Sequence, residues 1–143
     1  MASGQTRKEP IVLWPSAART VATPTETTAT MPIPADCEAL LLVLDVTAAA
    51  TDAGDTLNVE VYTDLGVAAV KEICHFTQVL GNGGALCHVA KIVVPVAEAM
   101  YSYAALTAGN IKNILGQTIS CKYTIVDADA DGSFTFSVVA IPL

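Results

Sequence analysis

The chain of 143 residues is long enough for one domain that buries about two thirds of the surface its unfolded form would expose. Its formal net charge is −7, and 15% of its residues are charged, against about 25% in an average soluble domain. The acidic balance argues against nucleic-acid binding, because phosphates require a basic face, and the shortage of charges indicates that a partner covers part of the surface.

The beginning of the chain, MASGQTRKEP, has no apolar stretch behind its charges, so we expect no signal peptide. The longest apolar run, residues 39–50, is interrupted by Asp45 and is shorter than the roughly 18 residues of a membrane span. We therefore expect a soluble protein that is made in a cytoplasm and binds no membrane.

Residues 1–10 are polar and lack periodicity, which is typical of an arm that is mobile or held by a partner. The run Ile11–Arg19 predicts a first strand, and Pro15 favours a position at a sheet edge. Residues 20–34 are rich in threonine and proline, which favours an extended crossing over the surface.

The same region carries the candidate partner-binding residues. Arg7, Lys8 and Arg19 against Glu9 give the first twenty residues a net charge of +2, which suits contact with an acidic neighbour. Trp14 is either a platform on which a partner or sugar stacks or a plug over the end of the core. We expect partner contacts at Arg7, Lys8, Trp14 and Arg19.

Four strand-like runs occupy the middle of the chain. The most apolar, Ala39–Thr47, predicts a strand buried on both faces. Leu57–Tyr62 alternates apolar and polar residues, which predicts one face in the core and one in water. Lys71–Leu80 and Ala85–Val94 flank a glycine-rich turn at residues 81–84 and predict a hairpin.

Two further alternating runs, Thr118–Val126 and Ser133–Ile141, predict a second hairpin that completes one sheet. The alanine-rich Val96–Gly109 is expected to be a loop with at most one or two helical turns. This spacing of strands predicts an all-β fold, an antiparallel, jelly-roll-like β-sandwich of about eight strands. We expect an extended N-terminal arm and edge strand over residues 1–34 and the β-sandwich domain over residues 35–143.

The connecting DADADG is similar to the first half of a calcium loop. Asp127, Asp129 and Asp131, followed by Gly132, match the ligands and the turn glycine of an EF-hand. The bidentate glutamate that should end the loop is Val138, and strands replace the flanking helices, so we expect no EF-hand. A weaker calcium site and a charged turn without metal are the alternatives.

The four cysteines lack CxxC spacing. Cys74 and Cys87 lie on either side of the glycine-rich turn, so a disulfide between them is one interpretation, and buried free thiols are the other. Each is followed by a histidine, His75 or His88, which suggests zinc. Adjacent strand residues point to opposite faces, however, so we expect no zinc site.

The chain has no nucleophile elbow and no activated-cysteine signature. Its Gly81–Gly84 stretch lacks the lysine and the following helix of a phosphate-binding loop. We therefore expect neither an enzyme nor a cofactor.

Four segments carry a resemblance: IVLWPSAARTVATPT, the DVTA-like strand followed by GDTLNVEVYTD, CHFTQVLGNGG, and the terminal TIVDADADGSFTFSVVAIPL. Together they resemble a widespread group of small tailed-bacteriophage proteins encoded among the head genes. The resemblance implies a β-sandwich virion component, a capsid decoration or cement protein. Its partner would be the major capsid protein lattice, which it would bind as a homo-oligomer, often a trimer at local threefold positions.

The resemblance also implies that the aspartates form an ordinary turn between strands. Two alternatives use the same fold. One is a tail, neck or head-fibre component of the virion, and the other is a carbohydrate- or calcium-binding module.

Overall fold

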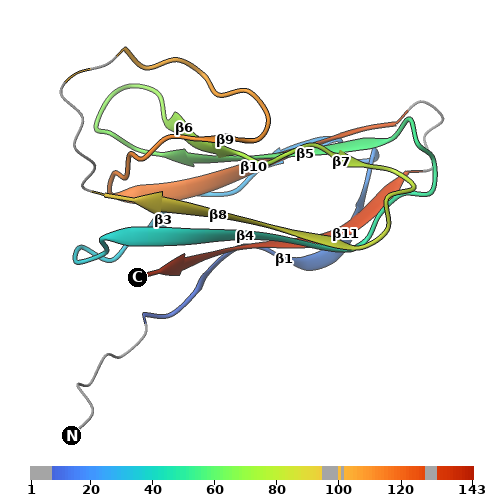
Figure 1. The fold of residues 1–143 in the computed structure, drawn as a ribbon, viewed down its shortest axis with the longest axis horizontal. Coiled ribbons are helices and arrows are strands. Elements are labelled where there is room, and N and C mark those ends of the chain that lie inside the picture. Colours follow the sequence, from blue (N-terminus) through green and yellow to red (C-terminus); the bar gives the residue numbers. More distant parts are fainter. Residues whose placement is uncertain (1–7, 95–99, 101, 128–131) are drawn as a thin grey trace, which may run out of the picture.

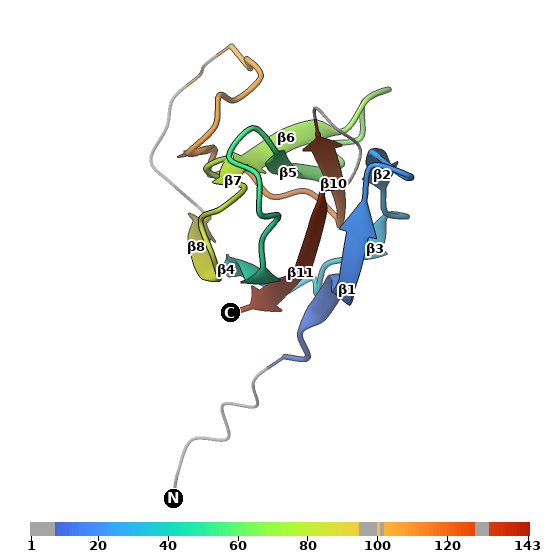
Figure 2. The same cartoon turned by 90° about the vertical axis from the view of Figure 1, so that its right-hand side faces the viewer.

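The computed structural model describes residues 8–94, 100, 102–127 and 132–143, and every regular element within them is a β-strand (Figure 1). The strands form two antiparallel sheets that pack face to face, seen as two layers in Figure 2. The prediction of an all-β, antiparallel β-sandwich is therefore confirmed. The described residues include no helix with the length and apolar character that a membrane crossing needs.

The first sheet has four strands in the order β1, β11, β4 and β8. Their bounds are Ile11–Thr20 for β1, Ser133–Pro142 for β11, Ala39–Ala48 for β4 and Leu86–Val93 for β8. β1 and β8 therefore form the edges, and an edge is where a strand containing proline is tolerated.

The second sheet has seven strands, several of them short. β10 (Thr118–Val126) and β5 (Thr56–Thr63) form its centre. β2 (Thr25–Thr27) and β3 (Met31–Pro32) pair with one side of β10. On the other side of the sheet lie β6 (Lys71–His75), β7 (Val79–Leu80) and β9 (Asn110–Ile111).

The chain passes repeatedly from one sheet to the other, because β1, β4, β8 and β11 lie in the first sheet and the strands between them lie in the second. This order is compatible with the jelly-roll-like arrangement, which stays a prediction. The short pieces β2, β3, β7 and β9 raise the number of strands to eleven, above the predicted eight or so.

The core lies between the two sheets and consists of alternate residues of each strand. β5 shows the pattern most clearly: Leu57, Val59 and Val61 are buried, as predicted, and the residues between them are half-buried rather than in water. The largest fully buried side chains come from both sheets: Tyr123, Phe134, Phe136, Leu40, Leu42, Leu44, Leu57, Ile73, Ile92 and Ile119.

The C-terminal hairpin prediction is wrong, although the strand bounds Thr118–Val126 and Ser133–Pro142 agree closely with it. β10 pairs with β5 in one sheet, and β11 pairs with β1 and β4 in the other. The apolar faces of β10 and β11 therefore point toward each other across the core. Alternation shows which face of a strand is buried, but it does not show which sheet the strand joins.

The hairpin predicted across residues 81–84 is also wrong, because β6 pairs with β5 while β8 pairs with β4. The turn instead carries the chain between sheets. Its Gly81 packs so closely that an added Cβ would lie 1.8 Å from the carbonyl oxygen of Asp52. Cys74 is buried, Cys87 is exposed, and both are free thiols, so the structure does not contain the disulfide that was one interpretation of these two cysteines.

The strand Ala39–Thr47 was predicted to be buried on both faces, and this is wrong. In β4 one face is buried, whereas Leu41 and Val43 on the other are half-buried and Asp45 is exposed. Its apolar outer residues are unusual for a sheet face in contact with water.

Part of the predicted N-terminal arm belongs to the sandwich. β1 pairs with β11 over its length, and β2 and β3 add strands to β10. The first strand begins at Ile11, so the arm is limited to residues 1–10, of which residues 1–7 lie outside the described part of the chain. Residues 11–32 therefore supply sheet structure rather than a free arm.

Arg19 and Trp14 close the core at the β1 edge. The Arg19 guanidinium lies 4.6 Å from the ring centroid of Phe136 and 5.1 Å from that of Trp14. It donates hydrogen bonds to the carbonyl oxygens of Pro15, Ala17 and Phe136. Trp14 meets Tyr123 edge to face, with 5.1 Å between centroids. We therefore assign both side chains to the sandwich rather than to partner contact.

Replacing Arg19 by lysine should lower the free energy of unfolding by about 1–2 kcal/mol, because a point-charge ammonium cannot form the same fork of hydrogen bonds or stack on the rings. Urea unfolding measures the change. Lys91→Arg, on an exposed side chain of β8, is the control and should stay within about 0.5 kcal/mol of the parent. Equal stability of Arg19→Lys and parent would contradict this role.

Candidate functional site

A row of four valines crosses the outer face of the first sheet. Val12 of β1 is in register with Val139 of β11, Val139 with Val43 of β4, and Val43 with Val89 of β8. Val12 is 48% exposed and Val89 58% exposed, and the inner two are half-buried. We call these four residues the valine row.

The surroundings of the valine row differ between its two sides. On one side Ile141 and Leu41 are in register beside it, and Val93 at the end of β8 is 41% exposed. On the other side the neighbouring row is polar, with Ser137 of β11 in register with Asp45 of β4. On the three strands β11, β4 and β8, the charged outer residues are Asp45 and Lys91, one of each sign. Among the described residues no other strand packs over this face (Figures 1 and 2). A chain with a net charge of −7 thus presents an apolar stripe on a sheet face whose charged residues on these three strands balance.

The outer face of the second sheet is polar. The corresponding row across its strands is Thr27, Lys122, Glu60, His75 and Asn110, in register from β2 to β9. The two outer faces of the sandwich therefore differ in chemistry, one with an apolar row and the other with a polar row.

A β-bulge gathers the polar side chains on β6. Glu60 is in register with His75 and Tyr62 with Glu72, with a register shift between Val61 and Tyr62. In a regular strand Glu72 and His75, three residues apart, would point to opposite faces. The extra residue of the bulge brings both onto the outer face beside Glu60.

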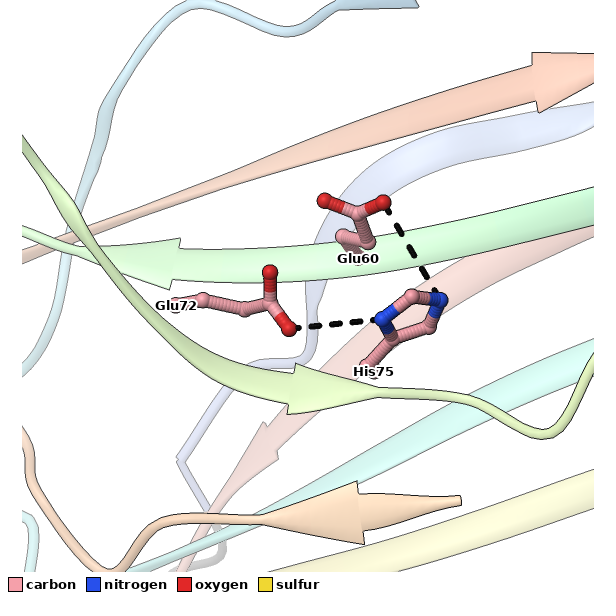
Figure 3. Close-up of side chains that lie close together, drawn as sticks. All are labelled: Glu60, Glu72 and His75. Carbon is pink, nitrogen blue, oxygen red and sulfur yellow. Dashed lines mark ion pairs between the residues drawn. The ribbon is translucent and has the colours of Figure 1, made fainter. Parts of the chain in front are cut away.

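Glu60, Glu72 and His75 lie together, as Figure 3 shows, and we call them the Glu–Glu–His cluster. The His75 Nδ1 atom is 3.4 Å from Glu72 Oε1, and its Nε2 atom is 4.0 Å from Glu60 Oε1. The Tyr62 hydroxyl donates a hydrogen bond to the second oxygen of Glu60. The carbonyl oxygen of Leu106 lies 3.3 Å from His75 Nδ1.

The segment before β9 covers this cluster. The Tyr103 hydroxyl donates to the carbonyl oxygen of Glu72 at 3.0 Å, and the Gly109 amide donates to that of His75 at 2.8 Å. The Lys71 ammonium lies over the Tyr103 ring, 5.3 Å from its centroid. With this cover, the side chains of Glu72, His75 and Glu60 are 8%, 16% and 19% exposed.

Burial dominates the electrostatics of the cluster. It raises the pKa of Glu72 above its ordinary value, and the neighbouring Glu60 carboxylate raises it further while His75 opposes the change. Burial and the hydrogen bond to Glu60 raise the pKa of Tyr62. Two acidic groups and one imidazole in a nearly dry site can share a proton or hold a cation.

The cluster provides no activated nucleophile. The raised pKa of Tyr62 keeps its hydroxyl protonated at neutral pH, and burial raises the pKa of nearby Cys74 to about 12. Nucleophilic catalysis needs the opposite shift. These side chains are therefore suited to binding rather than to covalent chemistry.

The predicted site residues lie elsewhere. Asp127 accepts a hydrogen bond from the Gly132 amide, which suits a turn, and Asp129 and Asp131 lie outside the described residues, so the calcium alternative stays untested. Lys8 contacts Asp36, with 3.5 Å between Nζ and Oδ1, and Arg7 is outside the described part of the chain.

The sequence contained only weak signals for the two surfaces. The continuous apolar run 39–44 indicates that both faces of this part of β4 are apolar. It does not show that the outer face is only half-buried. The Glu–Glu–His cluster was not predicted from the sequence, because nothing in the local sequence marks the bulge that brings Glu72 and His75 onto one face.

Comparison with protein-family models found no match, and comparison with curated proteins and with solved structures also found none.

Replacing Glu72 by glutamine should stabilise the metal-free protein at pH 8. Because burial raises the pKa of Glu72, the folded chain takes up a proton more readily than the unfolded chain, so stability falls as pH rises through the folded pKa. Glutamine does not ionise, so the Glu72→Gln protein does not lose this stability as the pH rises. Urea unfolding in chelator at pH 8 and pH 4.5 should show a gain that shrinks at the lower pH.

Glu38→Gln is the control for this experiment, because the Glu38 side chain is exposed. It should change stability little at either pH. A Glu72→Gln protein that is less stable than the parent at pH 8 would show that the ionised carboxylate stabilises the fold.

Proposed function

We propose that the protein is a non-enzymatic structural component of a tailed-phage virion, a capsid decoration or cement protein. It binds the major capsid protein lattice through the outer face of β1, β11, β4 and β8. The valine row is the observation that carries the proposal, because it gives an uncovered sheet a continuous apolar stripe. The resemblance of the sequence to small phage head-gene proteins supplies the partner.

The chemistry of this face suits attachment to a shell. Val12 and Val89 are about half exposed, so a partner that covers them removes apolar area from water. Asp45 and Lys91 balance in charge, so the face does not repel a partner of either sign. Modest affinity per copy is sufficient on a lattice, because oligomeric copies that bind together multiply their attachment. A trimer is favoured because the resemblance to the phage head-gene proteins implies one.

The polar outer face of the second sheet then points away from the shell. Its row from Thr27 to Asn110 is compatible with water, and the segment 102–109 adds a further layer there. A decoration protein needs this two-sided character, because one face must lose water on binding while the other keeps it.

The aspartate substitution Val89→Asp should reduce binding to purified capsids at least about tenfold, since it places a charge in an apolar interface. Val126→Asp is the matched control: Val126 is 55% exposed at the end of β10 in the other sheet, close to the 58% of Val89. Co-sedimentation with capsids that lack the protein measures both variants, after unfolding curves show that both are folded.

Equal loss of binding by the two variants, or loss by neither, would rule out the valine row as the contact. Electron microscopy of immunolabelled virions then addresses the position. Label over the whole head supports decoration, and label confined to the neck, tail or head fibres supports the alternative virion location.

A further inference from the structure

We infer that the Glu–Glu–His cluster is a binding site for a divalent transition-metal ion of the zinc type. The ion would join β5, through Glu60, to β6, through Glu72 and His75. The site is independent of the valine row, since it lies on the outer face of the other sheet.

The ligand types and spacing support this assignment. The three side chains each offer one ligand atom, and these atoms lie within 4.8 Å of one another. Two ligands of a tetrahedral zinc ion, each about 2.1 Å from the metal, are roughly 3.4 Å apart. With His75 Nε2 as the ligand nitrogen, its distance to Glu60 Oε1 is 4.0 Å. Small rotations of the carboxyl groups, whose terminal torsions are broad, complete the geometry.

Unsatisfied buried atoms are a second, separate observation. Glu72 is 7% exposed, and its Oε1 atom has no hydrogen-bond partner among the described residues. The buried Nε2 atom of His75 also has none. In the tautomer in which Nδ1 donates to the Leu106 carbonyl oxygen, the lone pair of Nε2 faces the Glu60 carboxylate. Two acceptors that face each other in a largely buried site need either a shared proton or a metal cation between them.

A protonated His75 is the protein's own counter-charge for these carboxylates, and a bound metal ion would take the place of that proton. The ion pairs of Glu60 and Glu72 both go to His75. Lys71 lies over the Tyr103 ring instead. The Leu106 carbonyl oxygen orients the imidazole, as backbone carbonyls commonly do for histidines that bind metals.

The identity of the ion follows from the ligands. An imidazole with two carboxylates favours zinc and its neighbours over calcium and magnesium, which prefer oxygen ligands only. Three protein ligands leave a fourth position for water. A cavity of about 100 Å³ lies beside the cluster and is lined by His75, His88 and Asn110 among others.

The experiment measures the thermal unfolding of the full chain after chelator treatment, with and without micromolar Zn²⁺. We expect Zn²⁺ to raise the Tm of the parent by about 5–10 °C, because the ion binds only the folded site. Glu72→Gln and Glu60→Gln should each lose most of the rise. His88→Gln is the control, since His88 lines the same cavity but is outside the cluster, and it should keep the rise.

A second measurement separates this site from the thiols, because Cys87 is exposed and could bind zinc itself. Co²⁺ bound to nitrogen and oxygen gives visible d–d absorption without a thiolate charge-transfer band. Absence of a Tm rise in the parent, an equal rise in both glutamine variants, or a thiolate band that Cys87→Ser abolishes together with the rise would each overturn the assignment.

Discussion

The structure depends on one constraint: β10 and β11 turn their apolar faces toward each other from opposite sheets. Tyr123 of β10 and Phe136 of β11 meet there edge to face, with 5.4 Å between ring centroids. β10 and β11 are each an inner strand of their own sheet, so the strands that pair with them on both sides border the same core. Arg19 and Trp14 close that core at the β1 edge, where the sandwich would otherwise admit water.

The two sheets enclose the core with their inner faces, and their two outer faces carry different kinds of side chain. The outer face of β4 and β11 includes an apolar stripe around Val43 and Val139, whereas that of β5 and β10 carries Glu60, Tyr62 and Lys122. Folding alone requires neither choice. The apolar face points to a partner, and the polar face has room for a buried ionic cluster that one bulge and one covering segment create.

Much of the fold could be predicted from sequence, because local alternation determines where strands begin and end. Thr118–Val126 was predicted to the residue. Pairing could not be predicted, since β10 and β11 would show the same alternation in a hairpin or on opposite sheets. The valine row depends on register between four strands, and the Glu–Glu–His cluster depends on a bulge. Both are properties of long-range packing, which single residues do not signal.

A cryo-electron microscopy reconstruction of phage heads carrying this protein tests the central claim most directly. The account predicts that the sheet of β1, β11, β4 and β8 lies against the capsid shell, with Val43 and Val89 at the contact and the 102–109 segment facing outward. A reconstruction in which this sheet faces solvent while the second sheet contacts the shell would contradict it.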